Sequence, residues 1–367
     1  MVTIEPTWTI DRGMYVSFMA YDPITKVVVI KGNRTITTLN SATGEVRQTI
    51  QTRFAVSKPF MMYNEICAWA TDQGRGIEMR SLNGDLESYK KNHFMLGTTE
   101  VGWFLAMHRN RPVLCHPLGD TIQLNTAVTG DWRAQVSPDG MRVVFENMNG
   151  MLTIFNVETQ TEDIINVDPP QYSRVTFFLP NCVCFWFLDN IHGTAWFVEN
   201  GQIKSTTTCF RARQVVYDPL MNAFLVRKRN RISLFRVNTM LWDWTSNWRE
   251  TDSTEIVAVP NACCFVTTDV REWGSTIVYD SETGYPLRRL SEQYDPSYPL
   301  IVIPQTNQIV IADGQVVQMY DLSIGWSIDL HPRLHRDIRL AIRAFYRAMV
   351  VCNDLVNVVM SFRGRQR

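Results

Sequence analysis

The sequence predicts an all-β fold made of similar four-stranded units, and three observations lead to it. Tight-turn signatures recur along the chain, and each is followed by a β-rich run. The turns are spaced by about 40 residues, the length of one four-stranded meander. A single sheet of this size cannot bury both of its faces and needs neighbours like itself. The repeat therefore predicts a seven- or eight-bladed β-propeller over about residues 6–330.

The unit is clearest in the middle of the chain. Ser137-Pro138-Asp139-Gly140 is a turn signature, because Pro presets φ at the second position and Gly accepts a positive φ. Asn149-Gly150 is a second turn of the kind found in two-residue hairpins. The strands expected around these turns are 132–136, 141–145, 151–156 and 163–166. Ser137 to Gly140 is thus expected to join the first two strands of one blade.

Two markers repeat in the other units. The turn after the first strand is expected at Asp22-Pro23, Asn64-Glu65, Arg109-Asn110, Asp139-Gly140, Pro180-Asn181, Asp218-Pro219, Pro260-Asn261 and Pro304-Gln305. The third strand is expected to close on an apolar residue followed by Asn or Asp, at Leu39-Asn40, Leu124-Asn125, Phe155-Asn156, Tyr279-Asp280 and Tyr320-Asp321. The third unit is short, since only about 30 residues separate its turn from the next. Its fourth strand is either missing or supplied from elsewhere, which leaves seven or eight blades.

The ends of the chain differ from the repeats. Residues 5–10 read as a lone strand that completes the final blade beside the last repeat, whose own last strand is expected at 326–330. The first residues have no basic region or apolar run, so no signal peptide is expected. The most apolar stretch, 175–188, is interrupted by Pro180-Asn181 and is too short to span a membrane. These features predict a cytoplasmic or other intracellular location, with a virion as a further option.

The units resemble blades of the WD-repeat and quinoprotein-like propeller superfamilies. Ser137-Pro138-Asp139-Gly140, Tyr279-Asp280 and Tyr320-Asp321 carry the resemblance best. The Gly-His and Trp-Asp pairs of the family are not repeated, and Trp242-Asp243 is the only Trp-Asp in the chain. The resemblance implies a fold and no activity, because propellers include enzymes, receptors and scaffolds.

Charge and cysteine usage exclude some classes of partner and site. The chain has 36 basic and 36 acidic residues, so its charge does not predict nucleic acid as a partner. Most of the eight cysteines fall in expected strands, and there is no C-x-x-C pair and no His at zinc-finger spacing. We interpret the cysteines as small buried hydrophobic residues of a protein in a reducing compartment. No cofactor and no metal site are expected.

The sequence has no nucleophile motif and no phosphate-binding glycine loop. His108 and His116 flank one expected hairpin. They either face a common cavity or are strand-end residues at the surface, and the second interpretation is favoured. An enzyme remains an alternative, because propeller hydrolases can assemble carboxylates from several blades around the axis.

The densest aromatic patch is 241–249, and it suggests a site of interaction. In a regular strand Trp242, Trp244 and Trp248 would share one face. Either they fill the space between two blades, or they anchor a partner, since Trp and Arg dominate interface hot spots.

The tail, residues 331–367, changes from a strand pattern to a helical one. Leu334, Ile338, Ile342, Phe345, Met349 and Cys352 form an apolar stripe, with Arg336, Arg339, Arg343 and Arg347 on the opposite face. Its eight Arg and two Asp give a net charge of +6, which leaves −6 on the remaining residues. The stripe is expected to pack on an apolar surface of the chain or of a partner, with the arginines facing outward. A membrane surface is the weakest option, because the arginines do not flank the stripe.

The end of the tail resembles F-box-like tails in proteins of amoebae and large DNA viruses. The matching residues are Leu355, Val359, Ser361 and Phe362, and the Leu-Pro pair that opens an F-box is absent. The resemblance implies docking on the Skp adaptor of a ubiquitin ligase.

The function predicted for a propeller of residues 1–330 with a basic tail is that of a non-enzymatic protein–protein interaction scaffold, here a substrate receptor that docks through its tail. The partner-binding candidates are Trp242, Trp244, Trp248, Arg336, Arg339, Arg343, Arg347, Leu355, Val359 and Phe362. Other proteins are the expected partners, such as an adaptor or an assembly subunit. Two alternatives stay open: a structural component of a large assembly such as a virion, and a propeller hydrolase with an axial site.

Overall fold

The computed structural model describes residues 2–322 with gaps, and residues 323–367 lie outside the described part. The gaps are residues 4, 14, 33, 53–55, 72–75, 82–85, 92, 99–101, 109–110, 118, 120, 125–134, 138, 140, 147–151, 166–172, 181, 189–191, 211, 229–230, 246–254, 263, 269–275, 285, 292–298 and 304–305. The expected C-terminal helix and the boundary at 330 fall outside the described residues, as does the expected strand at 326–330.

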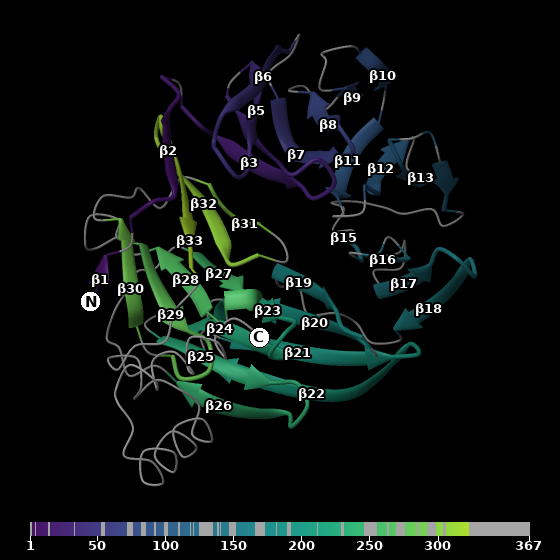
Figure 1. Cartoon of the computed structure of the whole chain (residues 1–367). Coiled ribbons are helices and arrows are strands. Elements are labelled where there is room, and N and C mark those ends of the chain that lie inside the picture. The colour runs from purple at the N-terminus through teal and green to yellow at the C-terminus, as the bar shows by residue number, and fades with distance from the viewer. Residues whose placement is uncertain are drawn as a thin grey trace, which may run out of the picture. The chain divides into compact units, whose positions relative to one another are not determined.

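Almost all regular structure in the described residues is strand (Figure 1). The strands are β1 (Val2–Thr3), β2 (Trp8–Asp11), β3 (Phe18–Asp22), β4 (Val27–Lys31), β5 (Thr35–Asn40), β6 (Val46–Gln51), β7 (Val56–Tyr63), β8 (Ile66–Thr71), β9 (Gly76–Ser81), β10 (Leu86–Lys91), β11 (His93–Thr98), β12 (Phe104–His108), β13 (Arg111–Cys115), β14 (Thr121–Gln123), β15 (Gln135–Val136), β16 (Arg142–Glu146), β17 (Leu152–Asn156), β18 (Thr161–Ile165), β19 (Ser173–Phe178), β20 (Val183–Leu188), β21 (His192–Glu199), β22 (Gln202–Phe210), β23 (Ala212–Asp218), β24 (Ala223–Lys228), β25 (Arg231–Arg236), β26 (Leu241–Thr245), β27 (Glu255–Val259), β28 (Cys264–Thr268), β29 (Thr276–Asp280), β30 (Pro286–Ser291), β31 (Leu300–Val302), β32 (Gln308–Asp313) and β33 (Val316–Asp321). A single 3-10 turn, Pro260–Ala262, is the helical element of this part of the chain.

These strands form eight sheets among the described residues. Seven of them are made of four strands that follow one another in the chain: β3–β6, β7–β10, β11–β14, β15–β18, β19–β22, β23–β26 and β27–β30. The eighth combines β31, β32 and β33 with β2 from the N-terminus. Repeated meanders of this kind are the blades of a β-propeller, so the predicted fold class is confirmed.

The central unit has the strand order that its turn signature predicts. The segment containing Ser137 and Asp139 joins β15 to β16, whose register pairs Val136 with Val143. The Ser137 side chain hydrogen-bonds Asp139 and accepts the N–H of Arg142 at 2.8 Å. The Asp139 carboxylate also accepts the N–H of Met141 at 3.0 Å. The short polar side chains therefore close the turn, as such residues do in Asx and Ser turns.

The third unit is complete, which corrects the expectation of a missing or borrowed strand. Its sheet has four strands, of which β14 has only three residues. Arg109-Asn110 is not the turn after the first strand, as the sequence predicts, but connects β12 to β13, the second and third strands. Likewise, Leu124-Asn125 follows β14, the fourth strand. The unit looked short because its markers belong to different connections from those of the other units.

The N-terminal strand completes the last sheet, as predicted. β2 pairs with β33 in that sheet, and the N–H of Thr7 donates to the carbonyl of Met319 at 2.7 Å. Trp8 is buried. Two residues upstream of this strand also pair: β1 runs parallel to β30 and becomes a fifth strand of the β27–β30 sheet. The pattern of the sequence did not predict this second pairing.

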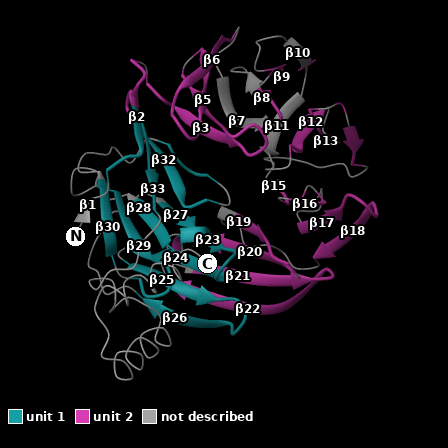
Figure 2. Cartoon of the chain, viewed as in Figure 1, with its two compact units in different colours: residues 1–9, 214–313, 317–367 teal, residues 10–213, 314–316 magenta. Residues whose placement is uncertain are grey.

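The chain divides into two compact units (Figure 2). Unit 1 comprises residues 1–9, 214–313 and 317–367, and unit 2 comprises 10–213 and 314–316. Inside unit 1, the β23–β26 and β27–β30 sheets enclose a core that includes Leu225, Leu234 and Phe265. Inside unit 2, β15–β18 and β19–β22 enclose a core with Val144, Phe185 and Phe187. The apolar residues of each unit are therefore buried between neighbouring sheets.

Glutamine side chains link the first strands of successive sheets. In unit 1, Gln214 accepts the N–H of Ile256 at 2.9 Å and donates to its carbonyl at 3.1 Å. In unit 2, Gln135 accepts the N–H of Thr176 at 3.1 Å. First strands have no partner strand on their inner side within their own sheet, so these amides satisfy backbone groups that would otherwise need water.

Among the described residues, no helix is long and apolar enough to cross a membrane.

Candidate functional site

The aromatic patch predicted from the sequence lies partly on β26, the outer strand of the β23–β26 sheet (Figure 1). Trp242 is paired with Phe235 and Trp244 with Leu234, although Phe235 and Leu234 are consecutive. Asp243 is therefore an extra residue on β26, which makes a β-bulge. A bulge interrupts the alternation of side chains that a regular strand would have.

The bulge separates the two tryptophans, so the expectation that they share one face is wrong. Trp244 packs with the core between this sheet and the β27–β30 sheet. Trp242 instead contacts Phe235, whose neighbour Leu234 points into that core. Consecutive residues of a strand point to opposite faces, which places Trp242 on the face opposite Trp244. Trp248 lies outside the described residues.

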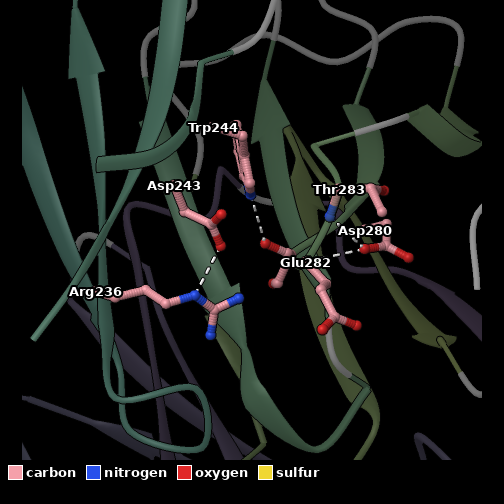
Figure 3. Close-up of polar contacts among 7 residues, drawn as sticks. Arg236, Asp243, Trp244, Asp280, Glu282 and Thr283 are labelled. Carbon is pink, nitrogen blue, oxygen red and sulfur yellow. Dashed lines mark hydrogen bonds and ion pairs between the residues drawn. The ribbon is translucent and has the colours of Figure 1, made fainter. Parts of the chain in front are cut away.

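Trp244 has the structural role that was one of the two predicted alternatives. Its ring is stacked on Phe265 with centroids 6.1 Å apart. Its indole N–H donates to the carbonyl of Ser281 at 3.2 Å, as Figure 3 shows. Gly284 has φ +70°, and a Cβ at this position would lie 2.7 Å from the Trp244 ring. Trp244 thus fills the space between two neighbouring sheets.

The turn that receives Trp244 is closed by Asp280. Its carboxylate accepts the N–H of Glu282 at 2.8 Å and that of Thr283 at 2.9 Å (Figure 3). Burial raises the pKa of Asp280, and these hydrogen bonds oppose the shift. Asn156 and Asn40 accept backbone N–H groups in the same way at the ends of β17 and β5. This turn chemistry explains why third strands close on Asn or Asp.

Trp242 contacts an aromatic ring and a cation. Its ring meets Phe235 edge to face at 5.1 Å between centroids, and the ammonium of Lys228 lies 4.8 Å from its centroid. The side chain is partly exposed. A cation over the face of an indole is an attractive contact that holds both groups in place.

The residues that flank Trp242 form an exposed row. Leu241 is 65% exposed, the largest value among the exposed large hydrophobic residues of the described chain. Asp243 accepts from Nε of Arg236 at 2.7 Å, and the two side chains are 40% and 32% exposed (Figure 3). The name β26 edge is used below for Arg236, Leu241, Trp242 and Asp243. It combines an aliphatic and an aromatic side chain on β26 with an ion pair that joins β26 to its neighbour β25.

The remaining predicted partner-binding residues are not placed. Arg336, Arg339, Arg343, Arg347, Leu355, Val359 and Phe362 lie outside the described residues.

The two histidines flanking the predicted hairpin do not face a common cavity. His108 pairs with Arg111 at one end of β13, whereas His116 follows Cys115 at the other end. The five residues of β13 separate them by about 16 Å along the strand. The second interpretation, two strand-end histidines, is the one that agrees with the register.

His116 takes part in an aromatic cluster that the sequence did not predict. Its ring is nearly perpendicular to Tyr63, at 5.1 Å, and to Trp103, at 5.0 Å between centroids. Gly102 has φ +88°, and a Cβ there would lie 2.6 Å from the ring of Tyr63. Tyr63 and Trp103 both pack against His116, so the cluster joins the β7–β10 and β11–β14 sheets.

Two buried aspartates in the described residues close turns. Asp218 is fully buried, and one of its oxygens accepts the N–H of Leu220 at 3.0 Å and of Met221 at 3.1 Å. Burial raises its pKa, which these two hydrogen bonds lower in part. Asp22 is also fully buried and accepts the N–H of Ile24 at 3.1 Å. Both acids precede Pro in the turn after a first strand, so their burial has a structural explanation.

Most cysteines in the described residues are buried. Cys67, Cys115, Cys184, Cys209 and Cys264 are buried, and Cys182 is partly buried. Burial raises the pKa of Cys67 and of Cys184, which keeps both protonated at neutral pH, whereas a metal binds the thiolate. Within the described ranges no group of three or more His, Cys, Asp or Glu could hold a metal ion.

Comparison with known proteins supports the fold and gives no information on function. No family model matches the sequence, and no curated protein matches it. The crystal structure of the computationally designed Ika8 protein aligns with a TM-score of 0.64 and 13% identity, over 88% of this chain and 100% of that chain. The shared feature is the fold. Identity this low does not carry a function from one propeller to another.

Proposed function

We propose that this chain is a non-enzymatic protein–protein interaction scaffold that binds a partner through the β26 edge. The observation that carries the proposal is the exposure of Leu241 beside the partly exposed Trp242 and the Arg236–Asp243 ion pair. Trp and Arg are enriched among residues that dominate binding energy, and apolar residues around them exclude water. The β26 edge therefore has the composition of a partner-binding surface.

The position of these residues on an outer strand suggests how a partner would bind. Among the described strands, none pairs with the outer side of β26. Such an edge presents unpaired N–H and C=O groups that an added strand can use. The chain contains one example of this pairing, because β1 lies on the outer side of β30. The partner in this proposal is an extended segment with an apolar side chain over Leu241.

The tail supplies a second docking element in the same proposal. Arg336, Arg339, Arg343 and Arg347 would face an acidic partner, and Leu355, Val359 and Phe362 would provide the adaptor contact that the F-box-like resemblance implies. A substrate receptor needs two such surfaces, one for the substrate and one for the adaptor. The buried cysteines of the described residues support an intracellular location, where thiols stay reduced.

Quantitative pull-down with the full chain tests the proposal. We expect the bound partner to fall at least tenfold for Leu241→Glu combined with Trp242→Ala, because both changes remove apolar contact area. Ile164→Glu is the matched control, since Ile164 is a 40% exposed aliphatic on another outer strand, β18. Equal capture of the same partners by wild type and double variant would contradict the proposal. A second set with and without residues 331–367 separates partners of the tail from partners of the β26 edge.

A further inference from the structure

Two exposed leucines lie at one end of the β23–β26 sheet. This end, called the turn end below, carries the connections β23–β24 and β25–β26. Leu220 lies in the first connection and is 58% exposed, and Leu241 directly follows the second and is 65% exposed. The two connections touch, because the N–H of Val237 donates to the carbonyl of Asn222 at 3.0 Å. Exposed aliphatic side chains on adjoining connections are covered in many proteins by a binding partner or another segment of the chain.

The described chain ends at the corresponding end of a sheet in the same unit. β33 is followed by Leu322, whose N–H donates at 2.7 Å to the carbonyl of Asn307, in the connection between β31 and β32. Leu322 shares a core cluster with Val259, the last residue of β27, and with Ala262. On the β27–β30 sheet, in turn, the connection after β29 receives the indole of Trp244 from β26. The turn ends of these three sheets therefore follow one another within unit 1.

The length of the tail matches this arrangement. The twelve residues from Leu322 to Leu334 can span up to about 40 Å, whereas two steps between packed sheets cover about 20 Å. Ala223 and Leu241 lie two strands apart through Arg236, a distance of about 10 Å. Residues seven apart on a helix, such as Ile338 and Phe345, are also separated by about 10 Å. The apolar stripe thus has the reach and the spacing to cover the leucines.

We infer that residues 334–349 dock as an amphipathic helix on Leu220 and Leu241 of the same chain. The apolar stripe faces the two leucines, and the arginines on its opposite face remain in solvent. The net charges of +6 on the tail and −6 on the remaining residues favour the encounter. Apolar contact then holds the helix, since single charge pairs at the surface contribute little.

This docking would regulate the β26 edge, a consequence that rests on the proposed function. Leu241 belongs to both surfaces, so a docked tail and a partner over Leu241 compete. The tail and the partner are then alternative occupants of Leu241, and a partner that captures the arginines of the tail would release it. The docking itself does not depend on whether the β26 edge binds a partner.

Photo-crosslinking in the full chain tests the docking. Benzoylphenylalanine replaces Leu241, the protein is irradiated, and crosslinked peptides are identified by mass spectrometry. We expect crosslinks to peptides from 334–349 within one chain, and at least a fivefold loss when Ile342→Asp is added. Benzoylphenylalanine in place of Ile164 is the matched control, and it should give no crosslink to the tail.

The possible outcomes separate the occupants of this surface. Crosslinks that join two chains would show a second copy on the leucines and overturn the proposal, as would irradiation that yields no tail peptide. Partner capture is then measured for Ile342→Asp alone. If the docking is right and the proposed function is also right, capture through the β26 edge rises. If the crosslinks form and capture does not change, the docking stands and the proposed function fails.

Discussion

At the scale of single residues, polar side chains in turns and glycines beside aromatic rings determine the local structure. Asp218 and Asp139 both close turns between first and second strands, but in different surroundings. Asp218 is fully buried, whereas Asp139 is exposed and lies near Arg142. The same residue type therefore responds to pH in opposite directions at two equivalent places in the fold.

The two acids should show opposite pH dependence. Burial raises the pKa of Asp218 above the ordinary 3.8, so its contribution to stability is full below that value and is lost as pH rises through the raised pKa. Burial also acts to raise the pKa of Asp139, but hydrogen bonds from Ser137 and Met141 and the charge of Arg142 lower it overall. Its contribution is present above the ordinary value and is lost as pH falls.

Urea unfolding of Asp218→Asn and Asp139→Asn between pH 3 and 7 checks this pair. The stability of wild type relative to Asp218→Asn should decrease with rising pH. Relative to Asp139→Asn it should increase from pH 3 to about pH 5 and then stay level. Differences that do not vary with pH for either variant would show that the two acids have the same pKa in the folded and unfolded chains.

Gly284 should tolerate alanine less well than Gly13 does. Both have positive φ, +70° and +59°, but an added Cβ meets Trp244 at Gly284 and nothing within 4 Å at Gly13. Gly13→Ala should cost about 1 kcal/mol for the backbone conformation. Gly284→Ala should cost roughly 1–3 kcal/mol more, because the indole must move. The free energies of unfolding of both variants measure this difference.

A double-mutant cycle separates the contact from the backbone effect. In the background of Trp244→Ala, the additional cost of Gly284→Ala should disappear, since no ring is left to meet the Cβ. If the two substitutions have additive effects, Trp244 does not set the requirement for glycine.

At the scale of elements, strands from outside the repeat complete two sheets. β2 supplies the fourth strand beside β33, and β1 adds a fifth beside β30. The two pairings differ in size: β2 buries Trp8 and has four residues, whereas β1 has two. They should therefore differ in their importance for stability.

Deletion of residues 2–11 should destabilise the chain far more than deletion of residues 2–4. The longer deletion removes β2 and the buried indole of Trp8, and loss of a Trp side chain from a core costs about 3–5 kcal/mol. The shorter deletion removes β1 alone and should lower the melting temperature by only a small amount. Thermal unfolding followed by circular dichroism compares the two, and similar melting temperatures would show that β2 is dispensable.

At the scale of the whole molecule, the described strands form all eight sheets without the tail. β33 ends at Asp321, and β2 occupies the strand position beside it. Among the described residues, no strand of these sheets extends beyond Asp321. The net charge, in contrast, does depend on the tail. Residues 331–367 carry +6 and the remaining residues carry −6, so the full chain is neutral.

A chain of residues 1–330 should keep the strand signal in far-ultraviolet circular dichroism and unfold in a cooperative transition. Its net charge should change from zero to −6, so it should bind an anion-exchange resin that the full chain does not retain at pH 7. Loss of the cooperative transition would mean that the tail belongs to the core of the fold. That result would contradict the division into residues 1–330 and 331–367.

The sequence by itself determined the fold class and most turns. Ser137-Pro138-Asp139-Gly140, the Asx turns at Asn156 and Asp280, and the closing strand at the N-terminus could be predicted because they depend on local φ preferences and hydrogen bonds. The fold repeats these local signals in every unit. The prediction for the third unit was wrong because Arg109-Asn110 resembles the turn after a first strand but lies one strand later. The residues of a turn do not indicate which two strands of a unit the turn connects.

The tertiary structure alone decided how the candidate site is arranged. A one-residue bulge at Asp243 turns Trp242 and Trp244 to opposite faces, and it depends on how β26 pairs with β25. The contact between Asn222 and Val237 depends likewise on two connections brought together by the sheet. Such features are set by cross-strand register and packing between sheets, which are long-range contacts that a local pattern of residues does not encode.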